Sequence, residues 1–204
     1  MDKQDKKKIV LASGNKHKIA EISAMLPDYE VVGYKEFFDG EIEETGKTFY
    51  ENALIKAKAV SERLNLPALA DDSGICVDAL SGAPGIYSAR YAGDGNDEHN
   101  NDLLLKNMQG VTDRRAKFVC CMVYYSPKGD ILSATGEVKG EILNERHGKN
   151  GFGYDPIFYS YELKKPMGIA TPEEKNSVSH RHRALVEIIG KIEEYEKNGE
   201  KIKR

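Results

Sequence analysis

The segment Asp71–Gly74 places two adjacent carboxylates, a hydroxyl and a glycine between two short apolar runs, Pro67–Ala70 and Ile75–Ala79. Both runs are typical of short strands, so we expect the acidic pair and the serine to lie where the first strand ends. Ligands of α/β proteins gather beyond the carboxyl ends of strands. Neighbouring aspartates repel each other unless a proton or a cation lies between them. The pattern predicts an active-site segment that binds a hard metal such as magnesium.

An ordinary turn is the alternative for this segment, because Asp, Ser and Gly are the usual turn formers. The loop at residues 82–93 favours function. Glycines and a proline constrain its backbone, and it carries polar and aromatic side chains at Tyr87, Ser88, Arg90 and Tyr91. Constrained polar loops more often carry function than packing.

A second candidate site is Ser13–Lys18, which reads Ser-Gly-Asn-Lys-His-Lys. It follows the apolar run Ile9–Ala12, typical of a strand buried on both faces, and precedes apolar residues at helical spacing, Ile19, Ile22 and Leu26. Free N–H groups and the positive end of a helix dipole attract phosphate. The Walker A pattern is missing, so a helix capped by Ser13 or Asn15 with solvated lysines is the alternative.

Glu43 and Glu44 precede a helix whose start, Thr48–Glu51, matches the capping box. Asn52 and Lys56 lie one turn apart on that helix. These residues could form a second wall of a metal and phosphate site, or the glutamates could belong to a solvated acidic loop. The order of residues does not choose between the two. The apolar stripe of the helix comprises Phe49, Ala53, Ala57, Val60 and Leu64.

The middle of the chain predicts a helix over 97–108 and a hairpin formed by 116–126 and 131–142, joined by Pro127–Asp130. The loop Gly148–Asp155 has glycine spacing and two aromatic rings. Such a loop could stack a planar base, although a loop of this kind is more often a structural turn.

Near the C-terminus, Thr171 and Pro172 predict a helix start, and a break is expected at 177–179. A second helix should end at Asn198-Gly199. Its apolar face comprises Leu185, Ile188, Ile189, Ile192 and Tyr195. The cluster of Lys175 and His180–Arg183 opposes the helix dipole, which hints at ligand binding. A lone histidine there would usually be exposed and structurally silent.

Composition narrows the class of protein. The 204 residues are 40% hydrophobic and 31% charged, with a formal net charge of −3. This balance is typical of a globular enzyme or binding protein, and we favour one folding unit with up to two lobes. The charge gives no support for nucleic-acid binding. The apolar runs are too short to span a membrane. The charged start shows no signal-peptide pattern. Three cysteines without metal-type spacing predict reduced, buried thiols in a cytosolic protein.

Taken together, these stretches resemble the non-canonical purine nucleoside triphosphate pyrophosphatases, the inosine/xanthosine triphosphatase family. The likeness covers nearly the whole chain after Lys7. Several ordered motifs at compatible spacing are specific, whereas each alone would be weak. They are Ser13–Lys18, Glu43–Phe49 with Glu51–Ala53, Ala70–Gly74, Gly85–Arg90, Gly151–Asp155 and Ser179–Arg181.

The resemblance implies an α/β fold, an elongated domain with a long central mixed sheet flanked by helices, and two lobes around an active-site cleft. Residues 8–204 would form this single domain, after a charged and disordered extension at 1–7. The implied reaction is Mg2+-dependent hydrolysis of ITP, dITP or XTP to the monophosphate and pyrophosphate, which cleanses the nucleotide pool. The implied state is a cytoplasmic homodimer that binds neither nucleic acid nor membrane.

The resemblance also assigns roles to residues. Glu44 and Asp72 would bind the metal, and Asp72 would act on the attacking water. The choice between Glu43 and Glu44, and a metal role for Asp71, stay open. The phosphates would contact Ser13, Gly14, Asn15, Lys16, His17 and Lys18, and Lys56 would also bind substrate. Ser73 would touch substrate, Phe152, Gly153, Tyr154 and Asp155 would contact the base, and Lys175, His180 and Arg181 would read its edge.

Two alternatives remain at this point. A related pyrophosphatase acting on pyrimidine or modified nucleotides would be told apart by base competition. A non-catalytic nucleotide sensor would bind ITP without releasing pyrophosphate, which the paired carboxylates disfavour.

Overall fold

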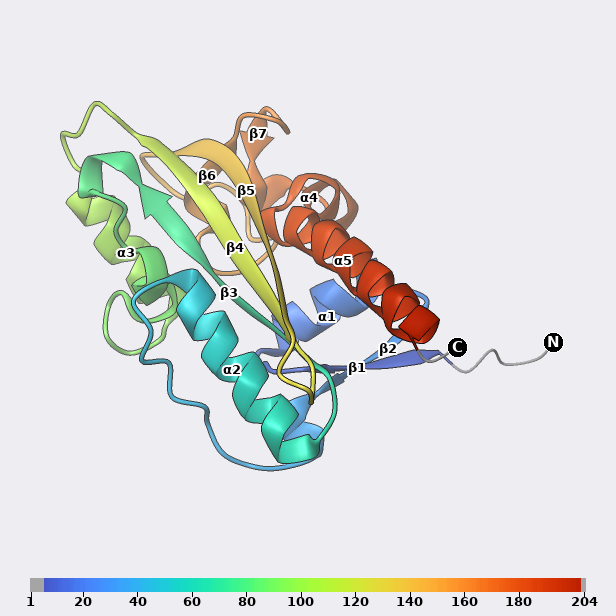
Figure 1. Ribbon diagram of the computed structural model, residues 1–204. Coiled ribbons are helices and arrows are strands. Elements are labelled where there is room, and N and C mark those ends of the chain that lie inside the picture. The colour runs from blue at the N-terminus through green and yellow to red at the C-terminus, as the bar shows by residue number, and fades with distance from the viewer. Residues whose placement is uncertain (1–5, 203–204) are drawn as a thin grey trace. The chain divides into compact units, whose positions relative to one another are not determined.

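The computed structural model of the chain describes residues 6–202. Seven strands pair in the order β2-β1-β3-β4-β5-β6-β7 (Figure 1). β1 pairs in parallel with β2 and β3, whereas β6 pairs antiparallel with β5 and β7. The predicted α/β class with a mixed sheet is confirmed. The strands are β1 (Lys7–Leu11), β2 (Tyr29–Gly33), β3 (Ala68–Val77), β4 (Arg115–Tyr125), β5 (Ile131–Ile142), β6 (Phe158–Ser160) and β7 (Lys165–Pro166); the helices are α1 (Lys16–Met25), α2 (Phe49–Leu64), α3 (Asp97–Asn107), α4 (Pro172–Val178) and α5 (His180–Ile202).

The chain divides into two compact units. Unit 1 comprises the described residues up to Asp72, Cys121–Thr135, and the described chain from Ala184 onward; unit 2 comprises Ser73–Cys120 and Gly136–Arg183. β3, β4 and β5 contribute residues to both units. The cleft expected between two lobes stays a prediction, as does the single-domain assignment. Of the charged extension at 1–7, Lys7 already belongs to β1, and residues 1–5 lie outside the described part.

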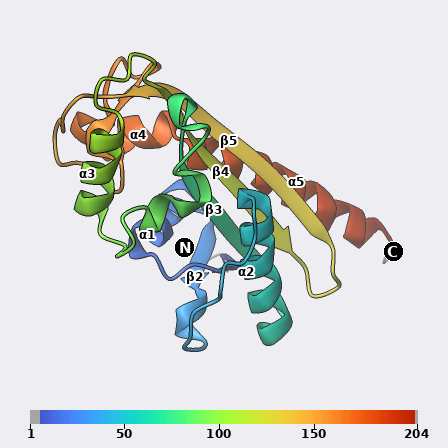
Figure 2. The ribbon, with the colours of Figure 1, turned by 90° about the vertical axis from the view of Figure 1, so that its left-hand side faces the viewer.

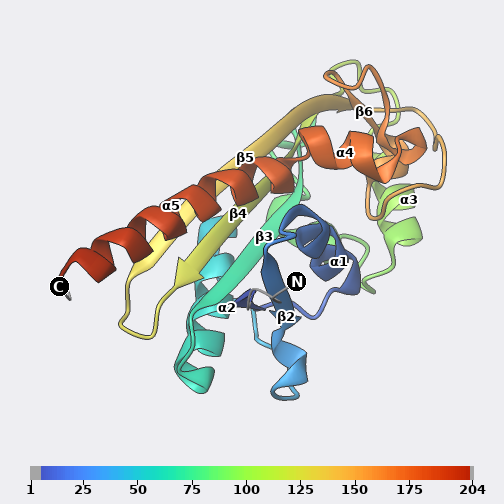
Figure 3. The same cartoon turned by 90° about the vertical axis from the view of Figure 1, so that its right-hand side faces the viewer.

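Unit 1 has its own apolar core. Ala53, Ala57 and Val60 of α2 supply the predicted helical stripe and pack against strand residues, so α2 covers one face of the sheet in this unit (Figure 2). α5 runs along the β4–β5 hairpin on the other face (Figure 3). There Lys191 Nζ donates to Ser133 O at 2.7 Å. The buried strand residues of this core are Val10, Ala68, Ala70, Cys121 and Val123.

Unit 2 is built around a second core. Leu104 and Met108 anchor α3 against it, and the rings of Phe118 and Phe158 lie 4.6 Å apart. Gly140 allows β6 to approach β5, because a Cβ there would lie only 2.1 Å from Tyr159 O. The cores of the two units thus draw on different residues of the long strands. The other buried members in unit 2 are Ile75, Val77, Ala116, Val138, Ile142, Tyr154, Ile157 and Met167.

The predicted helix starts are confirmed. Thr48 Oγ1 accepts from Glu51 N at 3.1 Å, and Thr171 forms a complete capping box with Glu174. The expected break also occurs, since α4 ends at Val178 and α5 begins at His180. The predicted hairpin corresponds to β4 and β5, which are neighbours in the sheet.

The prediction of two short strands around Asp71–Gly74 is wrong. β3 continues from Ala68 to Val77 without interruption, so the acidic pair lies in the middle of a strand rather than after its end. The turn-forming residues stay extended because side chains from other elements pair with both carboxylates. Gly74 serves close packing here: a Cβ would lie 2.3 Å from Gly85 O.

The predicted C-terminal stop at Asn198-Gly199 is also wrong, because α5 continues to Ile202. A single glycine inside a helix costs only about 1 kcal/mol relative to alanine, which a helix of 23 residues tolerates.

Two expectations about chain chemistry can be compared with the structure. The three cysteines are free thiols; Cys120 and Cys121 are buried, but Cys76 is only partly buried. Of the helices within residues 6–202, none combines the length and the apolar character needed to cross a membrane.

Candidate active site

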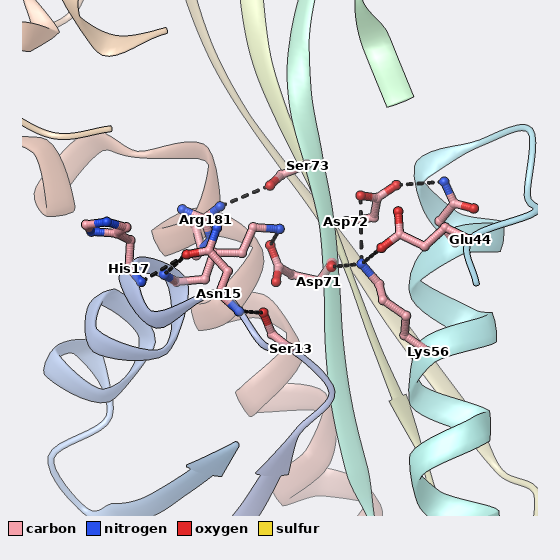
Figure 4. Close-up of polar contacts among 11 residues, drawn as sticks. Ser13, Asn15, His17, Glu44, Lys56, Asp71, Asp72, Ser73 and Arg181 are labelled. Carbon is pink, nitrogen blue, oxygen red and sulfur yellow. Dashed lines mark hydrogen bonds and ion pairs between the residues drawn. The ribbon is translucent and has the colours of Figure 1, made fainter. Parts of the chain in front are cut away.

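Asp71 and Asp72 are both buried in β3, where successive side chains point to opposite faces of the sheet (Figure 4). Asp71 Oδ2 lies 2.9 Å from Lys18 Nζ. Asp72 Oδ2 accepts a hydrogen bond from Asn52 Nδ2 at 3.1 Å. Alternation in the strand separates the two carboxylates and each has its own partners, so the metal role of Asp71 stays a prediction.

Lys56 lies at the centre of the charges in unit 1. Its Nζ donates to Asp71 O at 2.7 Å and forms ion pairs with Glu44 Oε1 at 2.7 Å and Asp72 Oδ1 at 3.8 Å (Figure 4). Burial by itself lowers the pKa of Lys56, but the charges of Asp71, Asp72 and Glu44 outweigh it and raise that pKa above its ordinary value. The ammonium group therefore stays charged at neutral pH.

The carboxyl group of Asp72 has an unusual pKa. The pKa of Asp72 is raised to about 6. Burial is the main cause and the nearby charge of Glu44 adds to it, whereas Lys56 and the Asn52 hydrogen bond oppose the rise. A carboxylate with a pKa near neutrality can accept a proton from water more readily than an ordinary aspartate. The raised pKa gives Asp72 the basicity that a general base requires.

The structure distinguishes between the two candidate glutamates. Glu44 is partly buried and faces Lys56, whereas Glu43 is exposed. Asn52, which has no exposed surface, holds the segment that carries them, because its Oδ1 accepts from Gly46 N at 2.8 Å. A Cβ at Gly46 would lie 2.6 Å from that oxygen, so the contact requires glycine.

The segment Ser13–Lys18 joins β1 to α1, as predicted. Asn15 is the cap: its Oδ1 accepts from His17 N at 2.9 Å and from Lys18 N at 3.2 Å, and Asn15 N donates to Ser13 Oγ (Figure 4). Gly14, Lys16 and His17 are exposed. The side chain of Lys18 is mostly buried and reaches Asp71. Lys18 thereby links the N-terminal end of α1 to Asp71 in β3.

In unit 2, two cations lie over an aromatic ring. Lys175 Nζ is 4.2 Å and the guanidinium carbon of Arg181 is 5.7 Å from the centre of the Phe152 ring. Lys175 also pairs with Asp155 Oδ2 at 2.7 Å, and the same oxygen accepts from Phe152 N at 2.9 Å. Gly151 makes this possible, since a Cβ there would lie 2.0 Å from Asp155 Oδ2.

Arg181 and His180, at the start of α5, are both buried. Arg181 is 1% exposed and donates from Nη2 to Ser73 Oγ at 3.0 Å (Figure 4). The ring of His180 stacks on Phe118 with centres 5.0 Å apart. The alternative reading of an exposed, silent histidine does not apply to His180, because the first two residues of α5 are buried. Gly153 and Tyr154 complete the loop, and Tyr154 is held by its hydroxyl, which donates to Ser88 O at 2.7 Å.

Each unit therefore gathers part of the candidate residues. In unit 1 the structure brings together Lys18, Glu44, Lys56, Asp71 and Asp72. In unit 2 it brings together Ser73, Phe152, Asp155, Lys175 and Arg181. Within residues 6–202, no three His, Cys, Asp or Glu side chains are grouped in a way that could hold a metal ion.

Asn52 is a residue of the candidate site that the sequence pattern does not assign to it. Its two contacts, to Gly46 N and to Asp72 Oδ2, link the Glu44 segment to β3. The signal that could have identified it is the spacing of four residues from Lys56, which puts both side chains on one side of α2.

Comparisons with known proteins show which family the chain is similar to. The model of the Ham1 family matches residues 9–191. A dITP/XTP pyrophosphatase of Staphylococcus aureus (strain MW2) is 48% identical over 181 residues, which cover 88% of this chain and 93% of that protein. The dITP/XTP pyrophosphatase of Staphylococcus epidermidis (strain ATCC 12228 / FDA PCI 1200) is 49% identical over 179 residues, which cover 87% of this chain and 92% of that protein.

Solved structures show the same fold. The Ham1 protein of Staphylococcus aureus superposes with a TM-score of 0.84 at 46% identity, covering 93% of this chain and all of that one (100%). A HAM1 protein from Coxiella burnetii has a TM-score of 0.85 at 41% identity, covering 92% of this chain and 99% of that one. The matched family model and these relatives span most of the chain, and the chain belongs to the Ham1 family.

Proposed function

We propose that this protein hydrolyses the non-canonical purine nucleoside triphosphates dITP, ITP and XTP to the nucleoside monophosphate and pyrophosphate. The observation that carries the proposal is the buried Asp72, held by Asn52 and Lys56 beside Glu44. The printed names of the relatives, dITP/XTP pyrophosphatase, support the same substrate class. Water is added across the bond between the α and β phosphates, so no oxidant or further reactant is required.

The residues of unit 1 would bind the phosphates and prepare the water. Lys18 and Lys56 carry the positive charge that a triphosphate requires, and the N-terminus of α1 adds its dipole. Asp72 would orient the water and take its proton, because its pKa of about 6 suits a general base. No covalent bond to the protein is needed.

The residues present fit a magnesium ion. Glu44 and Asp72 lie close enough for the charge of one to raise the pKa of the other, and a divalent cation would relieve that repulsion. Magnesium is usually bound by one or two carboxylates together with waters and substrate phosphates, so a third protein ligand is not required. When bound, magnesium neutralises phosphate charge and polarises the phosphoryl group.

The residues of unit 2 would recognise the base. Phe152 offers a ring for stacking, and Lys175 and Arg181 supply donors next to it. Hypoxanthine and xanthine present an oxygen acceptor at position 6, where adenine presents an amino donor. Hydrogen-bond donors buried in the site would have no acceptor on adenine. Such a mismatch can favour the 6-oxopurines over adenine by up to roughly 10⁴-fold.

A panel of nucleoside triphosphates tests the proposal. Release of pyrophosphate is measured with magnesium for ITP, dITP, XTP, GTP, ATP, CTP and UTP. The expected result is a kcat/KM for ITP and XTP far above that for ATP and the pyrimidines. A preference for pyrimidine nucleotides, or ITP binding without pyrophosphate release, would contradict it. The magnesium requirement is tested by removing the metal with EDTA and restoring it.

We also propose that the protein acts as a homodimer in the cytosol. The family resemblance supports the homodimer, and three free thiols suit a reducing compartment. Sedimentation equilibrium of the purified protein tests the assembly, and a monomer at micromolar concentration would contradict it.

A further inference from the structure

The loop Phe152–Asp155 contains the residues proposed to contact the base, and α3 holds its central residue at both ends of the backbone. Asn101 Nδ2 donates to Gly153 O at 3.0 Å, and Gly153 N donates to Asp97 Oδ2 at 2.8 Å. Asp97 and Asn101 lie four residues apart, one turn along the same side of α3. We propose that Asn101 is a positioning residue for base binding, an inference that rests on the proposed function.

Gly153 is the loop residue whose backbone is held by α3. Its φ of +62° lies in the left-handed region, which glycine adopts readily. The remaining loop residues have other anchors: Tyr154 reaches Ser88 O, and Asp155 binds Phe152 N and Lys175. Asp97 therefore holds the peptide between Phe152 and Gly153, and Asn101 holds the next peptide, between Gly153 and Tyr154. Because the two peptides meet at Gly153, a shift of the one that Asn101 holds moves the backbone that carries the stacking ring relative to Lys175.

The burial of Asn101 supports a positioning role rather than a purely structural one. Asn101 is 1% exposed, and its Oδ1 has no hydrogen-bond partner among the residues that the structure describes. A buried polar atom without a partner is unfavourable by about 1–3 kcal/mol. An apolar side chain of similar size would avoid that penalty, so packing alone does not account for an amide at this position. The contact that the amide does make is the one to Gly153 O.

Two variants test the inference. Asn101→Asp keeps the shape but places a carboxylate oxygen where the amide donor was, and Asn101→Leu removes the donor and keeps the volume. The control is Asn107→Leu on the same helix, because Asn107 is exposed and donates to Tyr91 OH instead of the loop. Thermal unfolding and circular dichroism check that each variant is folded. Should Asn101→Leu fail to fold, the kinetics and binding of Asn101→Asp alone test the inference.

Steady-state kinetics with ITP and calorimetric titrations with inosine monophosphate and with pyrophosphate provide the readouts. We expect KM for ITP and Kd for the monophosphate to rise roughly tenfold in both Asn101 variants, the effect of losing about one hydrogen bond. In both Asn101 variants we expect kcat and the Kd for pyrophosphate to stay within about twofold of wild type. We expect the same of KM, kcat and both Kd values in Asn107→Leu, because a twofold change is smaller than the effect of losing one hydrogen bond.

Unchanged KM and monophosphate affinity in folded Asn101 variants would overturn the inference. So would an equal loss of monophosphate and pyrophosphate affinity, because a general loosening of the structure would act on both. A wild-type protein that neither binds nor hydrolyses ITP would instead refute the proposed function, and this inference with it.

Discussion

In unit 1 the charged side chains of the site pair with one another, whereas in unit 2 two cations also lie over an aromatic ring. Lys56 contacts carboxylates from two different segments, those of Glu44 and Asp72. Lys175 and Arg181 lie over the ring of Phe152, and Lys175 also pairs with Asp155. Charges in mutual contact are suited to phosphates and a metal ion, and cations beside a ring are suited to a planar base with polar edges.

The comparison predicts that the two kinds of site can be separated by mutation. Changes in unit 1 should alter turnover and leave base preference intact. Changes in unit 2 should alter base preference and leave the chemical step intact. The variants below test this separation.

The largest effect is expected for Asp72→Asn. It removes the proposed proton acceptor and one proposed metal ligand, so turnover of ITP should fall by about 10²–10⁴-fold, while we expect ITP still to bind through the residues of unit 2. Turnover is measured at saturating magnesium and binding by calorimetry. The control is Asp102→Asn, an exposed aspartate on α3 paired with Arg146. Wild-type turnover in folded Asp72→Asn would remove Asp72 from the chemistry.

The raised pKa of Asp72 predicts how stability depends on pH in the protein without metal. Its pKa is raised from 3.8 to about 6, so between these values the folded state keeps a proton that the unfolded state releases. This contribution to stability is fully present below pH 3.8 and is lost as the pH rises through about 6. A shift of about two units corresponds to about 3 kcal/mol.

Asp72→Asn lacks this titration. Its free energy of unfolding relative to wild type should therefore increase between about pH 4 and about pH 7. Urea unfolding with EDTA present measures the difference at intervals across this range. A constant difference between the two proteins would show that Asp72 titrates normally.

A smaller effect, of about tenfold or somewhat more, is expected for Arg181→Ala on the ratio of kcat/KM for ITP to that for ATP. The ratio should fall because a donor beside the base is lost, and Arg181→Lys should restore part of it. Arg183→Ala is the matched control, since Arg183 is exposed and pairs with Glu162. An unchanged ratio in folded Arg181→Ala and Arg181→Lys would mean that Arg181 does not read the base.

The smallest effect is expected for Asn52→Ala. Losing the contacts to Gly46 N and Asp72 should lower turnover by about tenfold and raise the magnesium concentration that gives half-maximal rate. The ITP-to-ATP ratio should stay unchanged, because Asn52 belongs to unit 1. Glu62→Gln on the same helix is the control, as Glu62 is exposed. A changed base preference in Asn52→Ala would break the separation between the units.

Local sequence determined the elements of this protein and most of its candidate residues. The caps at Thr48 and Thr171 and the apolar stripe of α2 were readable because they depend on neighbours within a few residues. Ordered motifs along the chain also identified the family. These features are local, so no knowledge of distant contacts was needed.

Tertiary structure decided what local pattern could not. β3 stays extended through Asp71 and Asp72 because Lys18, Asn52 and Lys56 reach the two aspartates from other elements. Contacts of the same long-range kind place Glu44, rather than Glu43, next to Lys56. They also bury Arg181 next to Ser73. Turn propensity and sequence order carry no information about such partners, since the energy that fixes them comes from ion pairs and hydrogen bonds between segments far apart in the chain.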